Sequence, residues 1–128
     1  MRISKEQIPA KIDVPGAVAR HIGRFGDATA PTTMAGEWFS LAAGTDIQPL
    51  LKGLDEDACQ APHWGYMLSG ELVVTFTNGT TETCRGNDLF YWPPGHSVRV
   101  EKDAEVILFS PEQAHAKVLN HMLTAMKG

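Results

Sequence analysis

The residues of this chain that could do chemistry are a few thiols and imidazoles. Its 128 residues include two cysteines, Cys59 and Cys84, and five histidines. Two cysteines are too few for a disulfide framework, so in a reducing compartment they would stay thiols or bind a metal. His115 and His121 are six residues apart on a predicted helix, which places them on different faces and excludes a metal pair. Nothing in the sequence indicates a partner for Cys84, and we expect it to be structural.

Motifs for several other chemistries are absent from the sequence. It has no Gly-x-Ser-x-Gly hydrolase elbow, no phosphate-binding loop and no Gly-x-Gly-x-x-Gly fingerprint. The tripeptide Asn78-Gly79-Thr80 matches a glycosylation acceptor, but an Asn-Gly hairpin turn explains these residues. Acyl transfer through a hydrolase elbow and nucleotide binding therefore have no support in the sequence.

Charge and hydropathy exclude further classes of protein. The 11 basic and 15 acidic residues give a net charge of -4, and the pI is near 5.7. A nucleic-acid surface needs a basic stripe, so we expect no nucleic-acid partner. No segment reaches the roughly 18 apolar residues that cross a bilayer, and residues 1–6 are charged where a signal peptide is apolar. We expect a cytoplasmic protein with no membrane partner.

The pattern of apolar residues predicts one all-β domain with additions at both ends. Residues 1–33 hold Pro and Gly without a sustained period, which predicts an N-terminal arm with one short strand at 16–22. Residues 34–110 hold short apolar runs bounded by turn residues, typical of a jelly roll, sandwich or small barrel. The expected strands are 37–42, 63–68, 71–77, 80–84, 89–92, 97–100 and 105–109.

Residues 111–128 are predicted to form a C-terminal helix. Ser110 stands at the N-cap position, Pro111 at the first helical position, and Gln113 could close a capping box. An apolar stripe runs along this helix through Ala114, Val118, Leu119, Met122, Leu123 and Met126. Such a stripe must pack on the barrel or on another subunit, and together with the arm it predicts a homodimer.

Two segments of the chain resemble the two motifs of the cupin superfamily. The first is 59–71, and the second is 87–96, where Asp88, Pro93 and Gly95 match. Asn87 stands where Gly is usual, and Asn is the next best residue for a left-handed backbone. The resemblance covers residues 57–98 and implies a double-stranded β-helix jelly roll of about eight strands. The wider pattern resembles small single-domain bacterial cupins without an assigned activity.

The same resemblance implies where a metal would bind. His63 stands at the position of the family's metal-binding Glu, and Cys59 and Asp57 stand at those of the first two His. The family's last ligand falls on Val98, which cannot bind metal, but His96 lies two residues earlier on the same face of the strand. A carboxylate, a thiolate and two imidazoles would suit Zn²⁺ or Fe²⁺.

Each of these candidates also has a plainer role. His63 could be a hydrogen-bonded core histidine, Cys59 a small buried apolar residue, and Asp57 part of a solvated acidic loop at 55–57. The candidates for the wall of a ligand pocket are Phe90, Trp92, Met67 and Val98.

Three functions remain open on the sequence alone. In the first, a divalent metal, Zn or Fe, supports an enzyme of the oxygenase, isomerase or lyase type that acts on a small organic molecule. In the second, the metal site is degenerate, and the barrel binds or senses a small molecule without metal. In the third, apolar side chains fill the pocket, and the protein serves only as a dimeric interaction partner.

Overall fold

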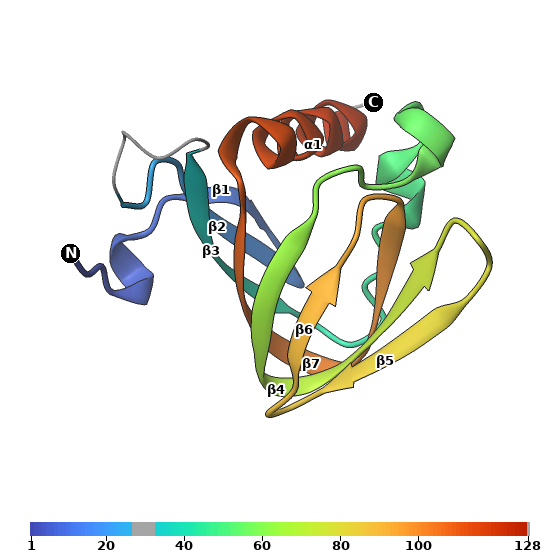
Figure 1. The fold of residues 1–128 in the computed structure, drawn as a ribbon, viewed down its shortest axis with the longest axis horizontal. Helices are drawn as coiled ribbons and strands as arrows, with labels where there is room; N and C mark the ends of the chain where they lie inside the picture. Colours follow the sequence, from blue (N-terminus) through green and yellow to red (C-terminus); the bar gives the residue numbers. More distant parts are fainter. Residues whose placement is uncertain (27–32, 128) are drawn as a thin grey trace.

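The computed structural model describes residues 1–26 and 33–127, and the strands among them join into one antiparallel sheet (Figure 1). The strand order is β1-β2-β3-β7-β4-β5, and β6 pairs with β4. The strands are β1 (Ala10–Val14), β2 (Ala17–Ile22), β3 (Met34–Leu41), β4 (His63–Phe76), β5 (Thr81–Arg85), β6 (Leu89–Trp92) and β7 (His96–Pro111). The helix α1 (Glu112–Lys127) follows, and short 3-10 turns are η1 (Lys5–Gln7), η2 (Gln48–Leu51) and η3 (Asp55–Asp57). Residues 27–32 of the expected arm and Gly128 of the expected helix lie outside the described residues.

The two central strands, β4 and β7, are longer than the sequence predicts. The expected strands at 63–68 and 71–77 are one strand of 14 residues, and those at 97–100 and 105–109 are one strand of 16. The β4–β7 register shifts between Met67 and Leu72, where Gly70 has a φ of 89°. A residue that looks like a strand end thus produces a β-bulge, at which the strand bends and continues. The two mergers reduce the eight expected strands to six, and the unexpected β1 brings the described residues to seven.

The N-terminal segment, expected as an arm, is part of the sheet. The expected strand at 16–22 is observed as β2, which pairs with β3 along its length. The preceding β1 forms a hairpin with β2 and was not predicted. Ile12 is its only buried residue, which is too little apolar sequence to produce a recognisable period.

The helix α1 lies across one end of the rolled sheet (Figure 1). Its buried residues Val118, Leu119 and Met122 belong to one apolar cluster with Ile12 and Leu51. The apolar stripe therefore packs on its own chain, and the homodimer stays a prediction. Within the described residues no helix has both the length and the apolar character needed to span a bilayer.

The start of the helix differs from the sequence prediction. Ser110 lies at 0% exposure in β7, and its hydroxyl donates to Glu37 rather than capping the helix. The helix begins at Glu112, whose backbone N–H donates to the carbonyl oxygen of Thr33 at 3.0 Å. The Ser-Pro pattern at 110–111 marks the start to within two residues, although the serine has another partner.

Two glycines with the same backbone conformation should respond differently to alanine. A Cβ at Gly70 would lie 2.2 Å from the carbonyl oxygen of Asp103, whereas one at Gly79, with a φ of 87°, would meet nothing within 4 Å. We expect Gly70→Ala to lower the free energy of unfolding by about 3 kcal/mol or more, since steric overlap adds to left-handed strain. We expect about 1 kcal/mol for Gly79→Ala. Urea unfolding measures both, and equal losses would contradict the assigned bulge.

Candidate metal centre

Three donor side chains meet where β4 and β7 begin. Cys59 forms a bridge with His96, in which the backbone N–H of Cys59 donates to the carbonyl oxygen of His96 at 2.8 Å. His63 is the first residue of β4 and pairs with Trp92 of β6. Each of the three donor residues is 2% exposed, and one donor atom from each lies within 4.8 Å of the others. Strand pairing therefore brings together residues that are up to 37 positions apart, from 59 to 96.

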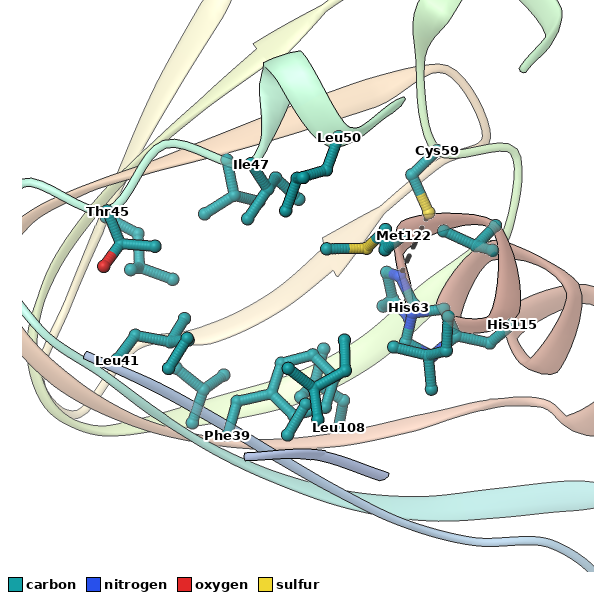
Figure 2. Close-up of a pocket in the computed structure, with 18 of the residues that line it drawn as sticks. Phe39, Leu41, Thr45, Ile47, Leu50, Cys59, His63, Leu108, His115 and Met122 are labelled. Carbon is teal, nitrogen blue, oxygen red and sulfur yellow. Dashed lines mark hydrogen bonds between the residues drawn. The ribbon is translucent and has the colours of Figure 1, made fainter. Parts of the chain in front are cut away.

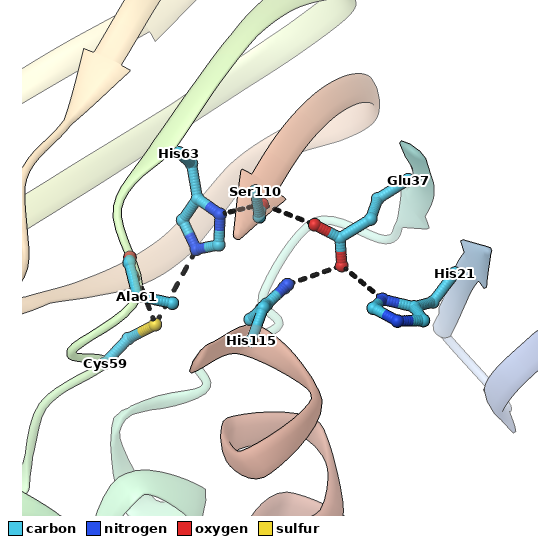
Figure 3. A network of polar contacts seen from close by, with 7 residues as sticks. All are labelled: His21, Glu37, Cys59, Ala61, His63, Ser110 and His115. Atoms are coloured by element: carbon cyan, nitrogen blue, oxygen red, sulfur yellow. Dashed lines mark hydrogen bonds and ion pairs between the residues drawn. The ribbon is translucent and has the colours of Figure 1, made fainter. Parts of the chain in front are cut away.

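The hydrogen bonds assign the protons on both imidazoles. Nδ1 of His96 lies 2.7 Å from the carbonyl oxygen of Pro93, which can only accept, so Nδ1 carries the proton. Ser110 donates its hydroxyl to Oε1 of Glu37 at 2.5 Å, so its oxygen accepts from Nδ1 of His63 at 2.5 Å (Figure 3). Both histidines thus keep a lone pair on Nε2, and that of His63 lies 3.6 Å from Sγ of Cys59.

Burial keeps these donors in their neutral forms. It lowers the pKa of His96 to about 4, although the hydrogen bond to Pro93 acts in the other direction. Burial and the nearby His115 hold the pKa of His63 well below its usual range. Burial raises the pKa of the Cys59 thiol to about 12. At neutral pH the cluster therefore consists of two neutral imidazoles and a thiol, which would have to release its proton to a metal.

The chemistry of this donor set fits a divalent metal. Two Nε2 lone pairs and one sulfur make three protein ligands, the number found at catalytic zinc sites that leave a fourth position open. Each Nδ1–H is held by an acceptor, Pro93 for His96 and Ser110 for His63, as is usual behind metal-ligating histidines. Among the donor residues, Cys59 is the soft ligand and favours zinc or iron over magnesium or calcium.

A second buried cluster stands behind His63. Glu37 of β3 is 2% exposed, and its Oε2 accepts from Nδ1 of His21 of β2 at 3.0 Å and is also bonded to Nδ1 of His115 of α1 (Figure 3). Burial opposes the ionisation of Glu37, but the charge and hydrogen bond of His115 and the hydrogen bond of His21 outweigh it and hold the pKa of Glu37 well below the usual range. The carboxylate is therefore ionised, and Ser110 connects it to His63.

Sequence reasoning missed Glu37, Ser110 and His115, although a signal for each was present. Glu37 has the strand parity of the inward-facing Phe39, and Ser110 has that of the buried Leu108. His115 precedes Val118 by three residues on the helix and shares its buried face. The sequence can predict that a polar residue in register with apolar ones points inward. It cannot predict which residue across the barrel that side chain will contact.

Asp57 is not part of the donor cluster. It ends the 3-10 turn η3 with a φ of 52°, is exposed, and its carboxylate accepts from the backbone N–H of Gly53 at 2.9 Å. Residues 57, 59 and 63 would share one face only in a fully extended chain, and the 3-10 turn at Asp55–Asp57 interrupts it. The other three predicted ligands are brought together, and Asp57 is corrected to a loop residue.

A cavity of about 250 Å³ adjoins the donors (Figure 2). Of the predicted wall residues, Trp92 and Val98 line it. Met67 and Phe90 do not: both lie in the core, where Phe90 stacks on Trp92 with ring centroids 4.0 Å apart. His63, His96, Cys59 and His115 all contribute to the wall. The presence of this space argues against the reading in which apolar side chains fill the pocket.

Comparison with known proteins identifies the fold. No family model and no curated protein matches the chain. Among solved structures, oxalate decarboxylase from Lactobacillus farciminis matches with a TM-score of 0.61 and 20% identity over 86% of this chain and 32% of its own. Ectoine synthase from P. lautus has a TM-score of 0.61 and 15% identity, covering 88% of this chain and 78% of its own.

A third structure is of the chain's own size. An RmlC-like cupin from Shewanella frigidimarina matches with a TM-score of 0.57 and 17% identity over 85% of this chain and 88% of its own. By contrast, the chain spans about a third or less of the oxalate decarboxylases it resembles. These likenesses confirm the cupin jelly roll as the fold, and at such identities they carry the fold alone.

The buried carboxylate should make stability depend on pH. Because the pKa of Glu37 is lower in the folded chain than its ordinary 4.5, its contribution is present above about pH 4.5 and is lost as the pH falls. We expect Glu37→Gln to cost about 3 kcal/mol or more of unfolding free energy at pH 7. The difference from wild type should shrink between pH 5 and pH 3. Urea unfolding across this range measures it.

The control for this experiment is Glu6→Gln, since Glu6 is exposed near the N-terminus. Its unfolding free energy should stay within about 0.5 kcal/mol of wild type at every pH. If the difference in unfolding free energy between wild type and Glu37→Gln stays constant from pH 7 to pH 3, the charge of the carboxylate does not contribute to stability.

Proposed function

We propose that this chain, which has the cupin fold, holds one divalent metal at Cys59, His63 and His96 and binds a small organic molecule in the adjoining cavity. One observation carries the proposal: the hydrogen bonds place both imidazole protons on Nδ1, so that two unprotonated Nε2 atoms and the Cys59 thiol, whose Sγ lies 3.6 Å from Nε2 of His63, meet at the wall of the cavity. A histidine that served packing alone would need neither an acceptor that holds its Nδ1 proton nor a thiol beside its Nε2 atom.

The properties of related structures agree with a metal in such a barrel. One oxalate decarboxylase that resembles this chain, from Bacillus subtilis, is described by its Mn(II) centres, and another neighbour is a salicylate 1,2-dioxygenase. The manganese centres and the dioxygenase activity belong to those two proteins. For this chain we propose zinc or iron, because a buried thiolate is a softer ligand than the oxygen donors that manganese prefers.

The residues around the centre have separable roles in this proposal. A bound metal would supply Lewis-acid chemistry through its open position. Glu37 and Ser110 hold the proton on Nδ1 of His63, so that Nε2 remains the ligand atom. The apolar wall, including Trp92, excludes water around the ligand. An oxygenase, isomerase or lyase type of reaction is compatible with this arrangement.

A metal-free binding or sensing protein is the second candidate. The observation that favours it is the cavity, whose apolar wall would accept a small molecule without any metal. The network of Glu37, His21 and His115 would then serve to hold α1 over the barrel. The two candidates differ in metal content, which can be measured directly.

Elemental analysis of purified, untagged protein tests the metal site. We expect about one equivalent of zinc or iron in the wild type and none in His63→Ala/His96→Ala, because one remaining thiol cannot hold the ion. The matched control is His121→Ala: His121 is bonded to the carbonyl oxygen of Lys52 and lies outside the cluster. It should retain the metal. Wild-type protein that holds no metal after reconstitution with Zn²⁺ and Fe²⁺ under reducing conditions would favour the second candidate.

The pH dependence of zinc affinity tests the role of Cys59. Because burial raises the pKa of its thiol to about 12, each zinc ion should displace one proton between pH 6 and pH 8.5. Zinc affinity should then rise about tenfold per pH unit in this range. In Cys59→Ala the affinity should be weaker and nearly independent of pH, because the pKa of His96 lies near 4. Competition titrations against a chelator, corrected for its own protonation, give these slopes. A steep slope in Cys59→Ala would place the released proton elsewhere.

A further inference from the structure

The polar groups of the cavity are gathered at one end. Figure 2 shows Cys59, His63 and His115 on one side and Leu41 and Thr45 on the other. The described lining side chains are apolar apart from Thr45, the cluster with His96, and Trp92. The indole N–H of Trp92 has no hydrogen-bond partner, and its ring lies at the donor end, with its centroid 5.9 Å from that of His63. Thr45 already donates its hydroxyl to the carbonyl oxygen of Gly16 at 3.3 Å. The far end of the cavity therefore has no free side-chain donor among the described residues.

The exposed part of the wall lies at this far end. Val14, the last residue of β1, is 39% exposed, and Pro15 is exposed. Pro15 and Gly16 form the β1–β2 turn, in which Gly16 accepts from Thr45. The donor residues at the other end are buried. A molecule that enters beside this turn would reach the donors with its leading end, and its remaining atoms would lie against apolar side chains.

From this arrangement we infer that the cavity selects a neutral, largely apolar molecule that carries a single hydrogen-bonding or metal-binding group at one end. The inference rests on the proposed function and names the ligand class for the same site. A second polar group would face the apolar wall without a partner, which costs free energy. The volume of about 250 Å³ limits the molecule to the small end of the range for ligand pockets.

The charges around the cavity also favour a neutral head group. The described lining residues include no Lys, Arg, Asp or Glu. The anions that face a metal at this centre would be the Cys59 thiolate and, behind Ser110, the carboxylate of Glu37, itself paired with His21 and His115. A carboxylate on the ligand would find no Lys or Arg among these lining residues, whereas an alcohol needs no such partner.

Calorimetric titration with matched six-carbon probes tests the ligand class. The probes are hexan-1-ol, hexane-1,6-diol and hexanoate, and each is added to zinc-loaded and to metal-depleted protein. We expect hexan-1-ol to bind about tenfold or more tightly than the diol, whose second hydroxyl would lie in the apolar end. It should also bind at least as tightly as hexanoate. Replacing pentan-1-ol by hexan-1-ol should tighten binding about three- to fourfold, the effect of one buried methylene.

Variants locate the binding in the cavity. Leu41→Trp should fill the apolar end and abolish hexan-1-ol binding while the zinc content stays at the wild-type level. The matched control is Leu68→Trp, since Leu68 is 38% exposed and outside the cavity, and it should retain both. Should Leu41→Trp fail to fold, Ile47→Phe at the same end, which is only half-buried, tests the same point.

The outcomes separate this inference from the metal site. If the protein takes up neither zinc nor iron and still prefers hexan-1-ol, the proposed metal is refuted and the ligand class stands. Zinc uptake with tighter binding of hexanoate or the diol would leave the metal and overturn the ligand class. Failure of hexan-1-ol to bind either form, or binding unchanged in both cavity variants, would also overturn it.

Discussion

The rest of the structure depends on one buried carboxylate. Glu37 is ionised inside the protein, where an unpaired charge costs several kcal/mol, so every group that compensates it must be held in place. Its partners come from three other elements: His21 from β2, Ser110 from β7 and His115 from α1. A rotation or shift of α1 would remove one of them. The carboxylate thus specifies how the helix sits on the barrel, which apolar packing between Val118 and its neighbours would leave less defined.

The same carboxylate links structure to chemistry. Because it accepts the hydrogen bond of the Ser110 hydroxyl, the serine oxygen can only accept from His63, which must therefore carry its proton on Nδ1 and present Nε2 to the cavity. The arrangement resembles the carboxylate support behind many metal-ligating histidines, with a serine interposed. His96 is oriented independently by the carbonyl of Pro93. The carbonyl of Pro93 thus orients His96, and the network of Glu37 and Ser110 orients His63. Both imidazoles are held in place before a metal binds, which limits the reorganisation that binding requires.

Some of this was predictable from local sequence, and particular residues show where prediction ended. The motif resemblance placed Cys59 and His63 in one candidate set, and the left-handed backbone expected at Asn87 is observed with a φ of 77°. Prediction failed at Asp57 because positions 57, 59 and 63 share a face only in an extended chain, and a turn at Glu56 and Asp57 breaks it. It failed at Ser110 because a serine before a helix usually caps the helix N-terminus, whereas the hydroxyl of this serine donates to the distant Glu37. Met67 and Phe90 were placed at the cavity wall because strand parity does not state how deep a side chain lies.

The sequence by itself determined the fold class, the approximate strands and three candidate donor residues that the fold brings together, Cys59, His63 and His96. These follow from short-range periodicity, from turn residues and from a motif resemblance over neighbouring positions. Only the tertiary structure decided which residues act together. His21, Glu37, Ser110 and His115 are separated by up to 94 positions, from 21 to 115, and meet because the sheet rolls and α1 covers its end. The reason is physical: one-dimensional patterns report which way a side chain points, whereas a hydrogen bond or a ligand set depends on the distance between elements that the chain joins only after folding.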